Sequence, residues 1–559
     1  TVATFHGHCL AQLRRETPGL RVAGPEERAG LLDELFPDCS ARERDEFSAA
    51  LSRAFRAGAA PADPPELARY PELLAERAQI DLEAVVGRTV QVLEQGGPAA
   101  EAMRRATGHL FVDEFQDVNQ AQYRLVALLA ATSTVFAIGD PDQAIYGFRG
   151  SDPRWFAAFI DEFAPETHQL VRNYRSGTAI VAAAGAVIAA NPHPRPMAPM
   201  RAESARPGAI HVQRCASPEH EAAWIADQIE AQLGGTSHRS LERLDQGATA
   251  RVSFADIGVL YRTARQGETI AAALAGRSIP FQLVDLEACY TRGDCRPLYL
   301  WLLLLAGLAS DDEQLALLGR CAGVGRHSLR LLRRRLRAIP PVAASPFVGD
   351  RLGPADGPVG AALHRFRSLY DRLRALAADQ PVEQVLLALA HEYHLDPQQP
   401  DLVRLRQLSL TFGNDLPACA AHLQTFSDSV LYDARAEAVT LSTLHAAKGL
   451  EFPLVCIAGA EAGLLPLAPR RPLTTEAERA HLEEERRLFY VGLTRAIATL
   501  CVSWAASRAV PGEPMAERQP SPFLADIPAP LVTAPPAVRL AAAKPRPVRR
   551  QLSLFPGHD

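Results

Sequence analysis

The 559-residue sequence predicts an α/β protein whose parallel-strand framework is interrupted by two long helical stretches. Short apolar runs recur, and polar residues follow each run directly, as expected for parallel strands that are buried on both faces. Between these runs lie two stretches of helical character without a convincing cluster of strands. Ligands of such sheets bind beyond the carboxyl ends of the strands, so the polar clusters are where chemistry is expected. The predicted strands are 110–112, 135–138, 169–171, 257–261, 439–442, 454–457 and 500–503.

Composition is that of an ordinary globular protein of several domains, with 47% hydrophobic and 22% charged residues. The net charge of −5 neither indicates nor excludes a nucleic-acid binder, because only the local charge of a binding groove matters. The longest apolar run, 298–309, is shorter than the ~20 residues that span a bilayer, so no membrane partner is predicted. Nine irregularly spaced cysteines without a C-x-x-C pair predict reduced thiols and a cytoplasmic location.

Lysine is almost absent from the chain. Lys448 and Lys544 are the only two lysines among 59 residues that are Lys or Arg. Where Arg has replaced Lys almost everywhere, a lysine that persists in an ordered segment is expected to be chemically required. Lys448 is such a residue.

An acidic pair follows the first predicted strand, 110–112. Asp113-Glu114 after an apolar strand is the Walker B arrangement of nucleotide hydrolases, in which one carboxylate holds Mg²⁺ and the next polarises the attacking water. The alternative is a strand end with two solvated acids. The functional interpretation makes Asp113 and Glu114 candidate catalytic residues, with Asp113 as the metal ligand.

Three further strand ends and one helix carry residues of the same chemistry. Gln143 follows the second strand and is a candidate sensor of the γ-phosphate. Phe148 lies in a glycine-flanked loop, where base stacking is favoured over the alternative of a core aromatic. Tyr174 follows the third strand as a candidate for stacking on adenine. Arg175 beside it, and Arg495 near the end of a helix predicted to start at 475, are candidate arginine fingers.

Taken in order, these blocks resemble the motor motifs of superfamily 1 DNA helicases of the UvrD/Rep/PcrA type. The resemblance runs from the start of the chain to about position 503. The matching motifs are T-F-H (4–6), D-E-F-Q-D (113–117), G-D-P-D-Q-A-I-Y-G-F-R-G (139–150), N-Y-R-S (173–176), L-Y-R-T (260–263), T-L-H-A-A-K-G-L-E-F (443–452) and Y-V-G-L-T-R-A (490–496).

The resemblance implies two RecA-like parallel-sheet domains, each with an α-helical insertion, that face each other across an ATP cleft. The first RecA-like domain is expected to be incomplete. The implied domains are 1–9 and 108–165 (first RecA-like domain), 10–107 (its insertion), 166–285 and 437–507 (second RecA-like domain), 286–436 (its insertion) and 508–559 (a disordered, proline-rich tail).

The resemblance also assigns roles to single residues. It implies that Asp113 binds Mg²⁺ and Glu114 activates water, with ATP as the nucleotide. The implied γ-phosphate contacts are Gln143, Arg175 and Arg495, and the implied adenine and ribose contacts are Tyr174 and Glu451. The implied path of single-stranded DNA is lined by Phe5, His6, Phe148 and His445. Family members move 3′ to 5′ on single-stranded DNA and separate the duplex, so a role in DNA repair or replication is expected.

The sequence departs from this family in one respect. The family's phosphate-binding loop, G-x-x-x-x-G-K-[ST], precedes T-F-H, but no lysine occurs here before Lys448. Two explanations are open: the chain is a truncated fragment, or it is a relative that lacks the loop. The first is favoured because the chain begins without Met inside a motif. We expect these 559 residues alone not to hydrolyse ATP.

The end of the chain carries a second resemblance. Q-L-S-L-F at 551–555 is similar to the pentapeptide by which bacterial proteins dock on the DNA polymerase sliding clamp. Leu552, Leu554 and Phe555 are expected to fill an apolar pocket, while Gln551 hydrogen-bonds at its rim. The alternative is a short hydrophobic tail that packs back on the motor.

Other functions fit less well. A helicase–nuclease of the RecB or AddA type needs a nuclease domain after the last motif, and the roughly 55 residues that follow here are too few. A non-catalytic DNA-binding adaptor has no need of the acidic pair and the arginine fingers. A metal site at His6, His8 and Cys9 lacks a fourth ligand at a plausible spacing.

Overall fold

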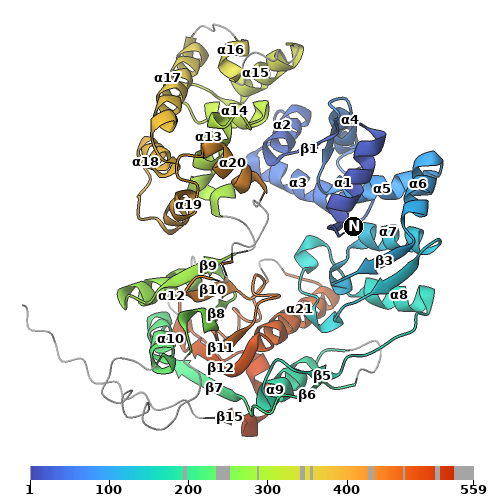
Figure 1. Ribbon diagram of the computed structural model, residues 1–559, viewed down its shortest axis with the longest axis vertical. Helices are drawn as coiled ribbons and strands as arrows, with labels where there is room; N and C mark the ends of the chain where they lie inside the picture. Colours follow the sequence, from blue (N-terminus) through green and yellow to red (C-terminus); the bar gives the residue numbers. More distant parts are fainter. Residues whose placement is uncertain are drawn as a thin grey trace, which may run out of the picture.

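Two lobes that contain sheets and two helical regions make up the chain (Figure 1). We call the lobe around residues 108–165 the first lobe and the lobe around the large sheet the second lobe. The computed structural model describes residues 2–192, 198–233, 252–285, 289–339, 347–352, 357–425, 432–433, 435–469, 472–509 and 516–533.

A seven-stranded parallel sheet, covered by helices on both faces, forms the second lobe (Figure 1). The strands span Ala209–Cys215 (β7), Ile257–Tyr261 (β8), Phe281–Val284 (β9), Val439–Thr443 (β10), Phe452–Ile457 (β11), Ala496–Ala505 (β12) and Val532–Thr533 (β15). The helices span Thr178–Ile188 (α9), Pro218–Gln232 (α10), Ala264–Gly276 (α12) and Thr475–Leu493 (α21). The strand order is β15-β7-β12-β11-β8-β10-β9. Helices α9 and α21 share one apolar core with the sheet, and α10 and α12 share the other. A large parallel sheet between helices is the α/β class that the sequence predicted.

The first lobe has a smaller sheet in the described residues. Strands β3 (His109–Val112) and β4 (Thr134–Ala137) pair in parallel, and helices α7 (Gln120–Ala130) and α8 (Arg154–Phe163) pack on one side of them. The buried ring of Phe115 lies in this core. Phe111 and Phe136 of the two strands are exposed, so the sheet presents an apolar face.

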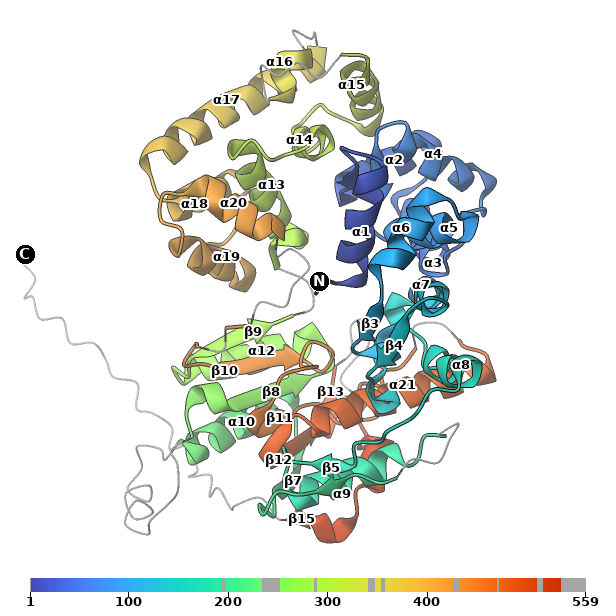
Figure 2. The ribbon, with the colours of Figure 1, turned by 45° about the vertical axis from the view of Figure 1, so that its right-hand side comes forward.

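Two helical regions lie side by side above the sheets in Figure 2. The first region consists of Phe5–Glu16 (α1), Pro25–Leu35 (α2), Ala41–Arg56 (α3), Arg69–Ala75 (α4), Ala84–Gln95 (α5) and Pro98–Ala106 (α6), with a short parallel pair of strands, Arg21–Ala23 (β1) and Gln79–Asp81 (β2). The second region consists of Arg296–Leu305 (α13), Asp311–Leu318 (α14), Arg326–Ala338 (α15), Val348–Leu352 (α16), Gly357–Asp379 (α17), Val382–Glu392 (α18), Pro400–Leu410 (α19) and Leu416–Thr425 (α20). Its helices enclose one large apolar core.

Ion pairs join the two helical regions. Asp33 of α2 accepts a hydrogen bond from Arg326 of α15 over 3.0 Å. Glu26, on the same helix, accepts from Nε of Arg296 of α13 over 2.9 Å. Charge therefore joins the helical regions, and among the described residues their buried apolar side chains form separate cores.

The prediction of a disordered tail from 508 onward is wrong for residues 516–533. Phe523 and Ile527 are buried in the core of the second lobe, and β15 extends its sheet. The many prolines of this segment suggested disorder, but a few large apolar side chains are enough to hold an extended chain against a core. The predicted strand 169–171 is also misplaced, because pairing begins at Arg172 and Asn173 (β5), which lie beside Arg201 and Ala202 (β6).

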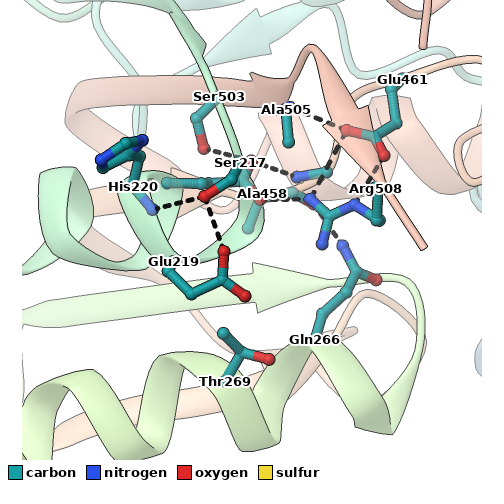
Figure 3. Close-up of polar contacts among 12 residues, drawn as sticks. Ser217, Glu219, His220, Gln266, Thr269, Ala458, Glu461, Ser503, Ala505 and Arg508 are labelled. Carbon is teal, nitrogen blue, oxygen red and sulfur yellow. Dashed lines mark hydrogen bonds and ion pairs between the residues drawn. The ribbon is translucent and has the colours of Figure 1, made fainter. Parts of the chain in front are cut away.

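A buried ionic network closes one end of the large sheet (Figure 3). Arg508 lies between two carboxylates, with its Nη2 2.5 Å from Glu221 and its Nε 2.6 Å from Glu461. Glu221 also accepts hydrogen bonds from the backbone of Gly459 and the hydroxyl of Ser503, both over 2.9 Å. Burial raises the pKa of Glu221, and Arg508 opposes that rise. The network links α10 to the chain that leaves strands β11 and β12.

Candidate functional site: a cleft between the two lobes

The acidic pair lies at the carboxyl end of β3, as the sequence predicted. Asp113 is exposed, and one of its carboxylate oxygens accepts a hydrogen bond from the backbone of Glu114 over 2.9 Å. Glu114 has a backbone φ of +50°, which a residue other than glycine seldom adopts and which costs about 1–3 kcal/mol. Gln116, which is buried, donates to the Glu114 carboxylate and accepts from the backbone of Asp140. The strained Glu114 is thereby fixed to the end of the neighbouring strand β4.

Lys448 of the second lobe reaches across to this acidic cluster. Its Nζ lies 3.2 Å from Glu114, forms an ion pair with Asp117 and donates to the backbone carbonyl of Gln143 over 3.1 Å. Burial raises the pKa of Asp117 to about 6, and Lys448 opposes that rise. One oxygen of Asp117 is buried without a hydrogen-bond partner. The ammonium group of Lys448 therefore joins both lobes at the point where the sequence predicted hydrolysis.

Gln143, a predicted γ-phosphate sensor, faces the same cleft. Its side-chain amide donates to the carboxylate of Asp140 over 2.8 Å, while its backbone carbonyl accepts a hydrogen bond from Lys448. The next residue, Ala144, accepts a hydrogen bond from Arg487 of α21 over 2.9 Å. The segment after β4 is thus held by two cations of the second lobe.

The two residues predicted to contact the γ-phosphate and the ribose pair with each other. Arg175 Nε lies 2.5 Å from the carboxylate of Glu451, and both side chains are partly exposed. The ring of Tyr174 beside them is 71% exposed, so one flat aromatic face is open for a base. These three residues belong to the second lobe, and the charges of Arg175 and Glu451 act on Arg495.

Arg495 lies deeper than a mobile arginine finger is expected to lie. It is 2% exposed and donates to the carbonyl groups of Val491 and Leu450 and to the hydroxyl of Thr494. Burial lowers its pKa to about 10, and the next largest cause is the positive charge of Arg175. The carboxylate of Glu114 also acts on this pKa, which places Arg495 within electrostatic reach of the acidic pair.

Aromatic residues of both lobes meet at the edge of the cleft. Phe148 is 57% exposed, and its ring lies edge-on to that of His445, with 5.5 Å between the centroids. Burial lowers the pKa of His445 to about 3, assisted by Arg262 and Arg149, so its imidazole is neutral at physiological pH. Arg149 lies 5.7 Å from the centre of the Phe148 ring. A neutral imidazole, an open phenyl ring and a nearby guanidinium group together suit a stacked base and its phosphate.

The other two residues of the predicted DNA path lie differently. Phe5 is partly buried and packs against two apolar cores at the start of α1. His6 is half-buried, and burial lowers its pKa, against the nearby charge of Glu83. Phe5 therefore supports the surface rather than offering a free ring.

Several cross-lobe contacts were not predicted from the sequence. Besides Lys448 with Asp117, the Tyr146 hydroxyl donates to the carbonyl of His445 over 3.4 Å, and Glu484 accepts from the backbone of Gly147 over 2.8 Å. Two signals in the sequence singled out Lys448: the rarity of lysine and its place in the motif at 443–452. The pairing itself had no local signal, because the two residues are 331 positions apart.

Among the described residues there is no helix long and apolar enough to cross a membrane. Within the same residues, no cluster of three or more His, Cys, Asp or Glu side chains is arranged to hold a metal ion. The predicted clamp-binding residues 551–555 lie outside the described part of the chain.

Comparisons with known proteins agree with this geometry. The family described as the UvrD/REP helicase N-terminal domain matches residues 62–164. The family described as the UvrD-like helicase C-terminal domain matches residues 168–334 and 420–507. The gap in the second match falls within the second helical region.

Three similar proteins each match most of the chain. ATP-dependent DNA helicase UvrD1 of Mycobacterium tuberculosis is 30% identical over 550 residues, covering 87% of this chain and 68% of the relative. DNA helicase II of Escherichia coli is 30% identical over 468 residues, covering 79% of this chain and 61% of the relative. ATP-dependent DNA helicase PcrA of Staphylococcus aureus is 26% identical over 579 residues, covering 94% of this chain and 76% of the relative.

Proposed function

Because the chain belongs to the UvrD/Rep family of ATP-dependent DNA helicases, we propose that it moves 3′ to 5′ on single-stranded DNA and separates the duplex ahead, in DNA repair or replication. The observation that supports this best is the contact of Lys448 with Glu114 and Asp117, which puts the acidic pair in a cleft shared by both lobes. Such a cleft allows ATP to control the distance between the lobes.

The residues of the cleft fit a nucleotide with Mg²⁺. The exposed carboxylate of Asp113 is a hard oxygen ligand of the kind Mg²⁺ prefers, and the unpaired buried oxygen of Asp117 is a second polar group nearby. A bound Mg²⁺ neutralises phosphate charge. Glu114, held by Gln116, orients the attacking water, and Arg175 stabilises charge on the transferred phosphoryl group. Tyr174 and Glu451 hold the base and the ribose.

DNA lies at the other edge of the cleft. Phe148 of the first lobe and His445 of the second touch each other, so opening or closing the cleft changes the space available to a base between them. Lys448 is three residues from His445 and forms an ion pair with Glu114, which connects hydrolysis to the DNA path through one short segment. Stacking and phosphate contacts do not read sequence, so the motor is expected to act on any sequence.

Replacing Phe148 with Ala is expected to weaken binding of single-stranded DNA about 5- to 150-fold, since stacking one base contributes ~1–3 kcal/mol. Binding is measured by the fluorescence anisotropy of a labelled oligothymidine at fixed salt. Phe111→Ala is the matched control, because Phe111 is also an exposed phenylalanine of the first lobe. Equal affinity of F148A and the unchanged protein contradicts the proposed DNA path.

We further propose that these 559 residues bind DNA without turning over ATP, since they contain no G-x-x-x-x-G-K-[ST] loop. Phosphate release by the purified chain in the presence of DNA tests this, and robust turnover overturns it. Direction is tested in a chain that joins these residues to such a loop. ATP-driven displacement of streptavidin from a 5′ end, but not from a 3′ end, is the expected result.

Docking on the bacterial sliding clamp is proposed from the sequence at 551–555. The double change Leu554→Ala and Phe555→Ala removes two of the three apolar side chains. Clamp binding in a pull-down with purified clamp is then expected to be lost, while DNA binding is unchanged. Clamp binding that survives the double change rules this partner out. We also place the protein in the cytoplasm, because the irregular spacing of its cysteines is typical of thiols that stay reduced there.

A further inference from the structure

A cavity of about 630 Å³ lies beside Phe148, between the first lobe and helix α3 of the first helical region. Its size is within the range of small-molecule and nucleotide sites. One wall is the face of α3 that carries Arg53 and Arg56. The opposite wall is the segment from Gly147 to Trp155. No residue of this cavity other than Phe148 has a role in the function proposed above.

Arg56 ties the two walls together. Its guanidinium donates to the carbonyl of Phe148 over 3.0 Å and forms an ion pair with Glu83. A side chain at Gly150 would approach Cδ of Arg56 to 3.0 Å, and Gly150 also has a φ of +82°. The cavity therefore has a fixed shape at the end where Phe148 lies.

Arg53 is the unused cation of this cavity. It lies three residues before Arg56, on the same face of α3, and its side chain is exposed. The described residues include no ion pair to it. The one acidic side chain that lines the cavity, Asp152, is held 3.1 Å from Arg154. An anionic group in the cavity thus meets a guanidinium group that has no competing carboxylate.

Arg154 and Trp155 lie together in the lining of the cavity. The guanidinium of Arg154 lies 4.6 Å from the centre of the Trp155 ring, and Trp155 is itself stacked on Tyr123 with 5.0 Å between centroids. The Arg154 side chain is 65% exposed. Planar guanidinium groups stack on nucleobases, and this one contacts a tryptophan ring that is itself held by a tyrosine.

From these features we propose that the cavity is a second nucleotide subsite, which receives the nucleotide next to the one on Phe148. Arg53 binds its phosphate, and the plane of Arg154, backed by Trp155, stacks on its base. The ligand class is single-stranded DNA, so this subsite rests on the function proposed above. Because α3 belongs to the helical region, the strand holds that region against the first lobe when it is bound.

The test separates the phosphate contact from the base contact. Oligothymidines are prepared intact, or with one abasic position on either side of the base that stacks on Phe148. Arg53→Ala is expected to weaken binding of all three oligonucleotides and to reduce the slope of log K against log salt by about 0.7. Arg154→Ala is expected to weaken binding of the intact strand about fivefold but to have no effect on the correctly placed abasic strand.

Arg42→Ala is the matched control, because Arg42 is on the same helix, is exposed and lies outside the cavity. Unchanged binding and salt slope are expected for it. If F148A weakens binding while R53A and R154A behave as R42A does, the second subsite is wrong and the motor function stands. If F148A, R53A and R154A all leave binding unchanged, both the subsite and the proposed DNA path are wrong. An equal loss for R154A on the intact strand and on both abasic strands also overturns the base contact.

Discussion

Replacing Arg508 with Met is expected to lower the free energy of unfolding of the second lobe by about 3–5 kcal/mol, the usual cost of leaving buried charges without a partner. Arg508 is the cation between Glu221 and Glu461, whose side chains are 3% and 1% exposed. Without it, the two carboxylates share a buried site with no counter-ion. The network closes the end of β11 and β12, so the loss is expected in the central strands (Figure 3).

The pH dependence of this loss follows from the pKa of Glu221. Burial already raises this pKa, and removing Arg508 raises it further. A carboxyl group whose pKa is raised in the folded state contributes to the free energy of unfolding at low pH, and this contribution is lost as pH rises through that pKa. The destabilisation by R508M is therefore expected to be larger at pH 8 than at pH 5.

Hydrogen exchange of peptides that cover β12, followed by mass spectrometry at both pH values, measures the effect locally. The control is Arg479→Met, since Arg479 is 71% exposed and lies 4.0 Å from its partner Glu483, and its change is expected to stay within about 0.5 kcal/mol. A triple variant in which apolar residues replace Glu221, Glu461 and Arg508 is expected to regain much of the protection of β12 against hydrogen exchange. A loss for R508M no larger than that for R479M contradicts the structural role of the network.

The sequence was sufficient where the chemistry is local. Asp113 and Glu114 directly follow an apolar strand, so their place at the carboxyl end of β3 could be predicted from the order of the residues. The same holds for β8, whose five residues are all buried and mostly apolar. Continuous apolar runs are informative because a strand buried on both faces has no position for a charged side chain.

Long-range packing decided the features that the sequence did not predict. Strand β7 was missed because His211, Gln213 and Arg214 interrupt its apolar residues, which is tolerated near the sheet edge. The ordered segment 516–533 was missed because its prolines outweighed Phe523 in a judgement based on composition. The depth of Arg495 was missed because it depends on the loop that contains Leu450.

Lys448→Met is expected to cost about 3–5 kcal/mol of stability at neutral pH, because it leaves the carboxylate of Asp117 buried without its counter-ion. The side chains of Lys448 and Asp117 are 8% and 20% exposed, so solvent replaces little of the lost interaction. The pKa of Asp117 is already raised to about 6 by burial, and Lys448 is the largest influence that opposes the rise. In K448M this pKa rises further. The stability that the protonated Asp117 contributes is then lost as pH rises through the new value, so the cost is expected to grow between pH 6 and pH 8.

A double-mutant cycle separates this pair from the rest of the cleft. Asp117→Asn removes the charge that needs Lys448, so K448M in the D117N background is expected to cost much less than K448M alone. Urea unfolding at pH 6 and pH 8 gives the four free energies. Because the pair spans the two lobes, the distribution of distances between fluorophores on α8 and α12 is expected to broaden in K448M, where the carboxylate of Asp117 is left without its cation. The distribution is expected to narrow again in the double variant, where that charge is removed. Additive costs, with no change in that distance, would mean that Lys448 packs within the second lobe and does not hold the cleft, and the coupling between ATP and DNA would then need another path.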